Sequence, residues 1–114
     1  MIVGIGVDLV DIAEFKNSIL TSDRIKEKLF TPNEIMFSDI SLAACFASKE
    51  ALIKAIGNYQ LFKWKSAEIE HDKFGKPMFL FHDELSEHMK YYEVLLSISH
   101  TKALVQAVVI LQAR

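Results

Sequence analysis

The chain has 114 residues, of which 51% are hydrophobic and 25% are charged, with four Gly and two Pro. This composition is typical of a folded globular protein and excludes the disordered, collagen-like and low-complexity classes. The 13 basic and 15 acidic residues give a net charge of −2. Nucleic acid is therefore not expected as a partner, because nucleic-acid-binding domains usually carry a basic excess. The length is that of one domain, so we expect residues 1–114 to form a single domain.

The sequence favours a cytoplasmic protein that does not enter a membrane. The single cysteine, Cys45, cannot form an intramolecular disulfide, which suits a reducing compartment. No apolar run approaches the roughly 18 residues of a membrane helix. The N-terminal segment 1–8 lacks the basic region of a signal peptide and is typical of a β-strand instead.

The N-terminal half predicts one strand followed by helices. Residues Ile2–Val7 are mostly β-branched, and Gly4 and Gly6 suit a buried strand that another backbone approaches closely. Asp11 is placed to cap a helix that extends to about Leu20. Three further helical segments follow: Arg24–Lys28 capped by Thr21 or Ser22, a helix start at the capping box Thr31-Pro32-Asn33-Glu34, and Leu42–Ile56 capped by Ser41.

The C-terminal half predicts two pairs of strands around one helix. The first pair is Trp64–Glu70 and Met78–Phe81, joined by a turn at residues 72–77. A helix capped by Asp83 and ending at about Tyr91 separates the pairs. The second pair is a β-hairpin whose strands are Glu93–Ser99, half buried, and Ala103–Leu111, buried on both faces. The element order indicates an α+β fold with a mainly antiparallel sheet packed with helices.

Charged residues stand against apolar sequence in two places. Asp8 ends the first strand, where it is either a metal ligand or a cap or salt-bridge partner for the following helix. Glu50 and Lys54 share an apolar face of the long helix with Phe46. They are either an ordinary i,i+4 ion pair or a carboxylate for a hard cation beside an ammonium group for a phosphate. For each place taken singly, the structural interpretation is the commoner one.

The segment Ser97–Lys102 gathers hydroxyls, an imidazole and an ammonium group at a strand end. It is equally consistent with a phosphate-binding edge and with a polar turn. No Ser-His-Asp triad and no Cys/His spacing typical of zinc are present. Cys45 lies within the long helix, where a buried and inert thiol is expected. The remaining histidines are expected in surface or turn positions: His71, His82 and His88.

Four of these segments together resemble the holo-[acyl-carrier-protein] synthases, the small 4′-phosphopantetheinyl transferases. They are the opening strand Gly4–Ile12, the helix motif Phe46–Gly57, the turn Asp72–Pro77 and the hairpin motif Ser97–Thr101. Each motif alone is weakly specific. Four motifs in the family's order, at nearly the family's spacing and across nearly the whole chain, are much more specific.

The resemblance implies transfer of 4′-phosphopantetheine from coenzyme A to a serine of an acyl carrier protein, with release of adenosine 3′,5′-bisphosphate, in fatty acid biosynthesis. It implies Mg²⁺ held by Asp8 and Glu50, with Lys54 facing a phosphate, so that these three residues are catalytic. The hairpin residues that match the family's phosphate region are Ser99, His100 and Thr101. The resemblance also implies a homotrimer with its site at the subunit boundary. The proton of the acceptor serine has two candidate acceptors, a metal-bound water or a carboxylate.

The chain departs from the family's pattern at positions expected to contact coenzyme A or the carrier protein. The departures are Glu14 in place of an arginine, Ala44-Cys45 in place of a basic residue, Gly57-Asn58-Tyr59 in place of Gly-Thr-Gly, and a shorter segment Met36–Ser41. The short basic helix keeps Arg24 and Lys28. These departures support a second hypothesis, a divergent non-catalytic trimeric module that binds coenzyme A or a carrier protein. A third hypothesis treats Asp8 as a cap and Glu50–Lys54 as a surface pair.

Overall fold

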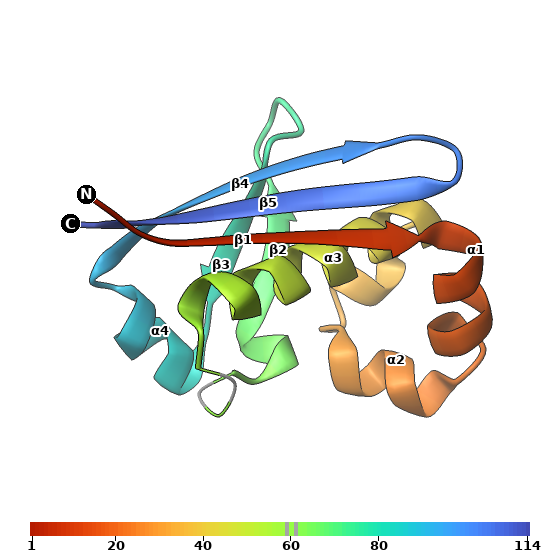
Figure 1. The fold of residues 1–114 in the computed structure, drawn as a ribbon. Coiled ribbons are helices and arrows are strands. Elements are labelled where there is room, and N and C mark those ends of the chain that lie inside the picture. The colour runs from red at the N-terminus through yellow and green to blue at the C-terminus, as the bar shows by residue number, and fades with distance from the viewer. Residues whose placement is uncertain (59, 61) are drawn as a thin grey trace.

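The computed structural model describes residues 1–58, 60 and 62–114. Figure 1 shows a long antiparallel sheet lying across α3, with α1 and α2 at one end of the molecule and α4 at the other. The elements in chain order are β1 (Ile2–Asp11), α1 (Ile12–Phe15), η1 (Lys16–Leu20), α2 (Asp23–Leu29), η2 (Glu34–Met36), α3 (Asp39–Ile56), η4 (Trp64–Ser66), β2 (Ala67–His71), β3 (Pro77–Phe81), α4 (Asp83–Met89), β4 (Tyr92–His100) and β5 (Leu104–Ala113). The expected α+β fold is confirmed. In the part of the chain that is described, no helix is long and apolar enough to cross a membrane.

The main sheet has the strand order β1-β5-β4, and all its pairings are antiparallel. The predicted C-terminal hairpin is confirmed as β4 and β5. The expectation that the last strand is buried on both faces is wrong. Its inner face is buried by Val105, Ala107 and Val109, whereas its outer face leaves Leu104 and Gln106 exposed.

The outer face of β1 is also uncovered, which corrects the prediction of a buried strand. Ile5, in the middle of this strand, is 66% exposed, and Val7 and Leu9 are exposed on the same face. Strand residues alternate between faces, so the residues between them turn inward toward α3. One face of the sheet therefore packs on the core, and the other presents apolar side chains to solvent.

The inner face of β1 packs directly on the backbone of α3. A Cβ atom at Gly6 would overlap the carbonyl oxygen of Ala51, and one at Gly4 would overlap that of Ala55. The predicted role of these glycines in a close backbone approach is thus confirmed. The contact fixes the distance between the strand and the helix that carry the predicted site residues.

Most predicted caps are confirmed, while some boundaries move. Asp11 accepts a hydrogen bond from the Glu14 N–H (2.9 Å) and begins α1, which continues as the π-helical turn η1. Ser38, rather than Ser41, caps α3, so the helix starts at Asp39. The other shifts are a 3₁₀ turn at Trp64–Ser66 in place of the start of a strand, a single 3₁₀ turn after the capping box, and His82 in place of Asp83 at the cap position of α4.

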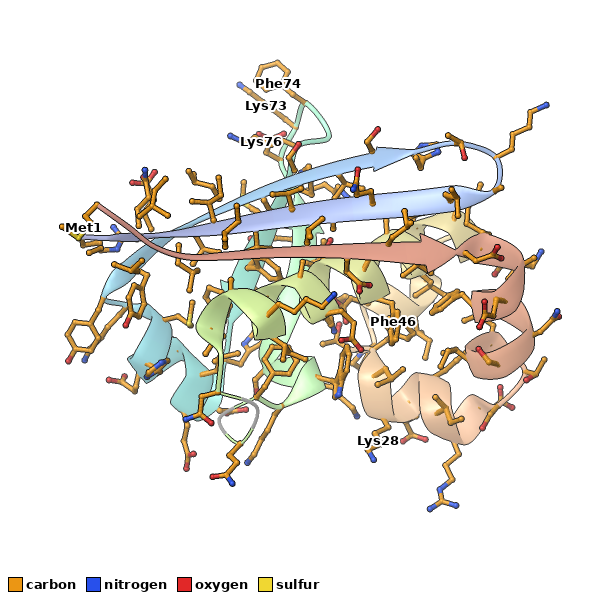
Figure 2. All side chains as sticks on the ribbon, in the orientation of Figure 1. Met1, Lys28, Phe46, Lys73, Phe74 and Lys76 are labelled. Atoms are coloured by element: carbon orange, nitrogen blue, oxygen red, sulfur yellow. The ribbon has the colours of Figure 1, made fainter. Side chains whose placement is uncertain are left out.

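The predicted turn at residues 72–77 joins β2 to β3 in a separate two-stranded sheet. The Asp72 carboxylate holds the turn by accepting hydrogen bonds from the N–H groups of Phe74 (2.8 Å) and Lys76 (2.9 Å). Figure 2 shows this turn standing clear of the main sheet, with Lys73, Phe74 and Lys76 at its tip.

Candidate functional site

A pocket of about 460 Å³ opens between the end of β1, the α1–η1 segment and α3. Its polar wall is formed by the predicted site residues Asp8, Glu50 and Lys54. The rest of its lining includes the acidic side chains of Asp11 and Glu14 and an apolar wall that contains Phe15, Ile19 and Phe46. Residues from distant parts of the sequence therefore meet in one cavity.

The close packing of β1 on α3 places the polar wall. Asp8 follows Gly6 on the inner face of β1, and Glu50 and Lys54 lie one helical turn apart on α3. The Lys54 ammonium group donates hydrogen bonds to the Val7 carbonyl oxygen (2.8 Å) and to Asp8 Oδ1 (3.2 Å). Lys54 thus reaches across to the strand instead of along its own helix to Glu50. Because Asp11 caps α1, the interpretation of Asp8 as that cap is wrong.

The surroundings of Glu50 in the pocket act on its carboxyl group. Burial raises the pKa of Glu50, the nearby Asp8 carboxylate raises it further, and Lys54 opposes both effects. The Asp8 side chain is 16% exposed, whereas that of Lys54 is 53% exposed. With Asp11 and Glu14, the pocket lining therefore holds four acidic groups and one partly solvated ammonium group, so its charge is negative.

Two of these acidic groups form a donor set that fits a hard divalent cation shared with a ligand. In the described ranges, no three His, Cys, Asp or Glu side chains come together as a metal cluster. Asp8 and Glu50, which both line the pocket, offer two carboxylates. Mg²⁺ is usually bound by one or two carboxylates together with phosphate oxygens and waters. Burial is the largest cause of the raised pKa of Glu50 and the Asp8 carboxylate adds to it, so a bound cation would favour the charged form of Glu50.

The apolar wall is held by stacked aromatic rings. Phe46 stacks on Trp64, with ring centroids 5.4 Å apart and planes 2° apart, and it also contacts Phe15 at 5.4 Å. Figure 2 shows Phe46 between α3 and the α1–η1 segment. The helical spacing places Phe46 on the face of Glu50, but the sequence pattern does not identify Phe15 and Ile19 as pocket residues. Those two residues join the wall only because α1 folds back against α3.

The structure does not bring the predicted hairpin residues into this pocket within one copy of the chain. Ser99 lies on the outer face of β4, and the His100 side chain is exposed. The Thr101 hydroxyl accepts hydrogen bonds from the N–H groups of Ala103 (3.2 Å) and Leu104 (3.1 Å), which is ordinary turn chemistry. A role of Ser99, His100 and Thr101 in binding a phosphate stays a prediction, and it requires the hairpin to contact the pocket of another copy of the chain.

The positions that depart from the family's pattern are divided between the pocket and other places. Glu14 lines the pocket. Cys45 faces the core instead, where its thiol lies 3.0 Å from Glu34 Oε2, and burial raises its pKa. Asn58 is exposed, and Tyr59 lies outside the described residues. The predicted burial of this thiol is confirmed, and its inertness stays a prediction.

Comparison with known families places the chain in a class. The family model described as the 4′-phosphopantetheinyl transferase superfamily matches residues 4–109, and the chain belongs to this superfamily. A curated relative, the holo-[acyl-carrier-protein] synthase of Leifsonia xyli, is 36% identical over 115 residues, which cover 98% of each chain. A second, from Alkaliphilus metalliredigens, is 37% identical over 120 residues, which cover 95% of this chain and 98% of the relative. Within the superfamily, the chain is a transferase of the holo-[acyl-carrier-protein] synthase family, as the four motifs indicated.

Solved structures of the same family share the fold. The holo-[acyl-carrier-protein] synthase of Neisseria meningitidis aligns with a TM-score of 0.86 at 28% identity, covering 98% of this chain and 99% of that one. That of Bacillus anthracis, solved in complex with CoA (3′,5′-ADP), aligns with a TM-score of 0.83 at 29% identity, covering 100% and 99%. The arrangement of β1, α3 and the C-terminal hairpin is therefore the family's arrangement.

Proposed function

We propose that this protein transfers 4′-phosphopantetheine from coenzyme A to a serine of an acyl carrier protein, in a Mg²⁺-dependent reaction that releases adenosine 3′,5′-bisphosphate. The observation that carries the proposal is the meeting of Asp8, Glu50 and Lys54 in one pocket of a chain that belongs to this enzyme family. Coenzyme A as donor is supported by the relatives from Bacillus anthracis and Helicobacter pylori, both solved in complex with it.

Asp8 and Glu50 would hold the Mg²⁺ ion in this proposal. When bound, the ion supplies positive charge that neutralises the diphosphate and favours departure of the adenosine bisphosphate. Lys54, whose ammonium group is half exposed beside Asp8, contributes a second positive charge toward the phosphates. The Phe46 ring, tilted against Phe15 and stacked on Trp64, gives the pocket an apolar wall that would limit water at the reacting phosphorus and so favour the serine over hydrolysis.

Mass spectrometry of an apo acyl carrier protein tests this function. We expect a mass gain of one phosphopantetheine when the protein, coenzyme A and Mg²⁺ are present, and no gain with EDTA or with Glu50→Ala. Coenzyme A that binds in a calorimeter without any transfer to carrier proteins of the same organism would favour the non-catalytic module instead.

We further propose that the protein assembles as a homotrimer through the outer face of its main sheet. This face carries the exposed apolar side chains of Ile5, Val7 and Leu9 on β1 and of Leu104 on β5. Exposed apolar surface of this kind typically marks an interface. A second copy is the occupant that also gives Ser99, His100 and Thr101 a role, because they would complete the pocket of a neighbouring subunit.

Analytical ultracentrifugation tests the assembly. The wild-type protein is expected to sediment as a trimer, and Ile5→Lys as a monomer with a lower transfer rate. A Lys73→Glu control at the distant β2–β3 turn should keep the assembly. If Ile5→Lys remains trimeric, this face is not the interface.

The proposed compartment is the cytoplasm, whose reducing conditions suit the unpaired Cys45.

A further inference from the structure

A buried ion pair is formed by Lys49, which directly precedes Glu50 in α3. Lys49 and Glu34 are both fully buried, and Lys49 Nζ lies 2.7 Å from Glu34 Oε1. Moving two charges out of water is costly, and apolar residues of similar volume often stabilise a core equally well or better. Stability alone therefore does not explain why the core contains this pair.

The acceptors of Lys49 come from three different parts of the fold. Its ammonium group donates to Glu34 Oε1, to the Leu29 carbonyl oxygen at the end of α2 (2.9 Å) and to the Trp64 carbonyl oxygen in η4 (2.9 Å). The same group lies 5.5 Å from the centroid of the Phe30 ring. All three N–H bonds of the ammonium group are thus used, and only one orientation of the side chain satisfies them.

Glu34 is held as firmly as Lys49. One carboxylate oxygen accepts from the Thr31 N–H (2.9 Å), within the capping box, and the other accepts from the Ile69 N–H (2.7 Å) and lies 3.0 Å from the Cys45 sulfur. No buried side-chain polar atom of the described residues lacks a partner. The pair is therefore a fixed point that joins α2, η2, α3, η4 and β2.

The buried pair adds charged contacts to the packing that orients α3. On the side of α3 that faces β1, the backbone of Ala51 and Ala55 packs on the two glycines of the strand, and Lys54 hydrogen-bonds to Val7 and Asp8. Rotation of the helix would in addition leave the buried charge of Lys49 without its partners. Successive residues of an α-helix are about 100° apart around its axis. Fixing the direction of Lys49 therefore fixes the direction of Glu50.

We propose that the Lys49–Glu34 pair is a positioning device that sets the rotation of α3, so that the Glu50 carboxylate faces Asp8 in the pocket. The proposal rests on the proposed function, because that function makes Glu50 a metal ligand. Neither Lys49 nor Glu34 lines the pocket, so both act through Glu50.

Calorimetric titration with Mn²⁺ alone tests this proposal, because it needs no turnover. The test variant is the double substitution Lys49→Met with Glu34→Gln, which removes both charges and keeps their approximate volumes, so that no buried charge is left alone. The matched control is Leu52→Ala, which removes buried side-chain volume from the same helix without touching the pair. All titrations are made well below the unfolding temperature of each variant, with folding verified by circular dichroism.

We expect the Kd for Mn²⁺ to rise at least about tenfold in the double variant, the range found when groups that orient metal ligands are removed, and to stay within about twofold in Leu52→Ala. Equal affinity in the wild type and the double variant would overturn the positioning role and leave the proposed function intact. A wild-type protein that binds no Mn²⁺, with or without coenzyme A, would overturn both. Equal losses in the double variant and in Leu52→Ala would show that the pair acts only on stability, which also overturns the proposal.

Discussion

Gly6→Ala tests whether the packing of β1 on α3 creates the site. The new Cβ would overlap the Ala51 carbonyl oxygen and would lie 2.9 Å from its carbonyl carbon and 2.8 Å from the Ala55 nitrogen, where ordinary contact begins at 3.4 Å. All these atoms belong to the helix backbone, so no rotamer change can remove the overlap. The strand and the helix must separate by at least about 1 Å, and this displacement acts on Asp8, two residues further along β1.

The expected loss of stability lies at the upper end of overpacking effects, about 3 kcal/mol. For a domain of this size, that corresponds to a fall of about 12 °C in the melting temperature. A displacement of about 1 Å between catalytic groups lowers the transfer rate about 100-fold. Thermal melting measures the first effect, and the initial rate of carrier modification, taken at a temperature where the variant is folded, measures the second.

Leu85→Ala is the matched control for this variant. Leu85 is buried in α4, away from the pocket, and its truncation costs about 2–5 kcal/mol. This control should lose similar stability and keep its transfer rate at the same low temperature. The reasoning is refuted if Gly6→Ala, when folded, transfers at the wild-type rate, or if the control loses as much rate as Gly6→Ala.

Three further predictions concern individual charges. Burial and Asp8 raise the pKa of Glu50, so the metal-free protein loses stability as the pH rises from the ordinary pKa of glutamate through the raised pKa. Glu50→Gln should therefore raise the melting temperature at pH 7 and lower the transfer rate at least about 100-fold, and a lower melting temperature would contradict this. Lys54→Met removes a charge-assisted contact of about 1.5–3 kcal/mol, so the KM for coenzyme A should rise roughly 10- to 100-fold in steady-state kinetics, and an unchanged KM would exclude a phosphate contact. Burial of Glu68 would raise its pKa, but hydrogen bonds from Thr31, His82 and Asn33 lower it overall, so the charged carboxylate stabilises the fold above the ordinary pKa and this stabilisation is lost as the pH falls through the lowered pKa. Glu68→Gln should therefore flatten the acid side of a plot of melting temperature against pH, and an unaltered plot would argue against this role.

The polar wall of the pocket could be predicted from local sequence. Asp8 comes directly after an apolar strand with two glycines, and those glycines indicated the close contact that places it beside α3. The i,i+4 spacing put Glu50 and Lys54 on one helix face. The identity of the partner of Lys54 could not be predicted, because a lysine can reach either along its helix or across to a strand, and only the packing decides.

Other features depend on contacts between distant segments or between copies of the chain. The apolar outer residues of β5 have the same pattern whether a helix or another subunit covers them, so the sequence could not show that this face is open. The Lys49–Glu34 pair joins segments that are not neighbours in sequence, and Lys49 in a helix otherwise looks like an exposed lysine. Ser38 and Ser41 are both good caps, and the choice between them depends on where the preceding 3₁₀ turn ends.

A crystal structure of the protein with Mn²⁺ and coenzyme A tests the central claim most directly. The account predicts an anomalous scattering peak bound by one oxygen each of Asp8 and Glu50 and by oxygens of the diphosphate, at distances of roughly 2.0–2.3 Å. A diphosphate bound elsewhere, or a pocket without the metal whose two carboxylates point apart, would contradict it.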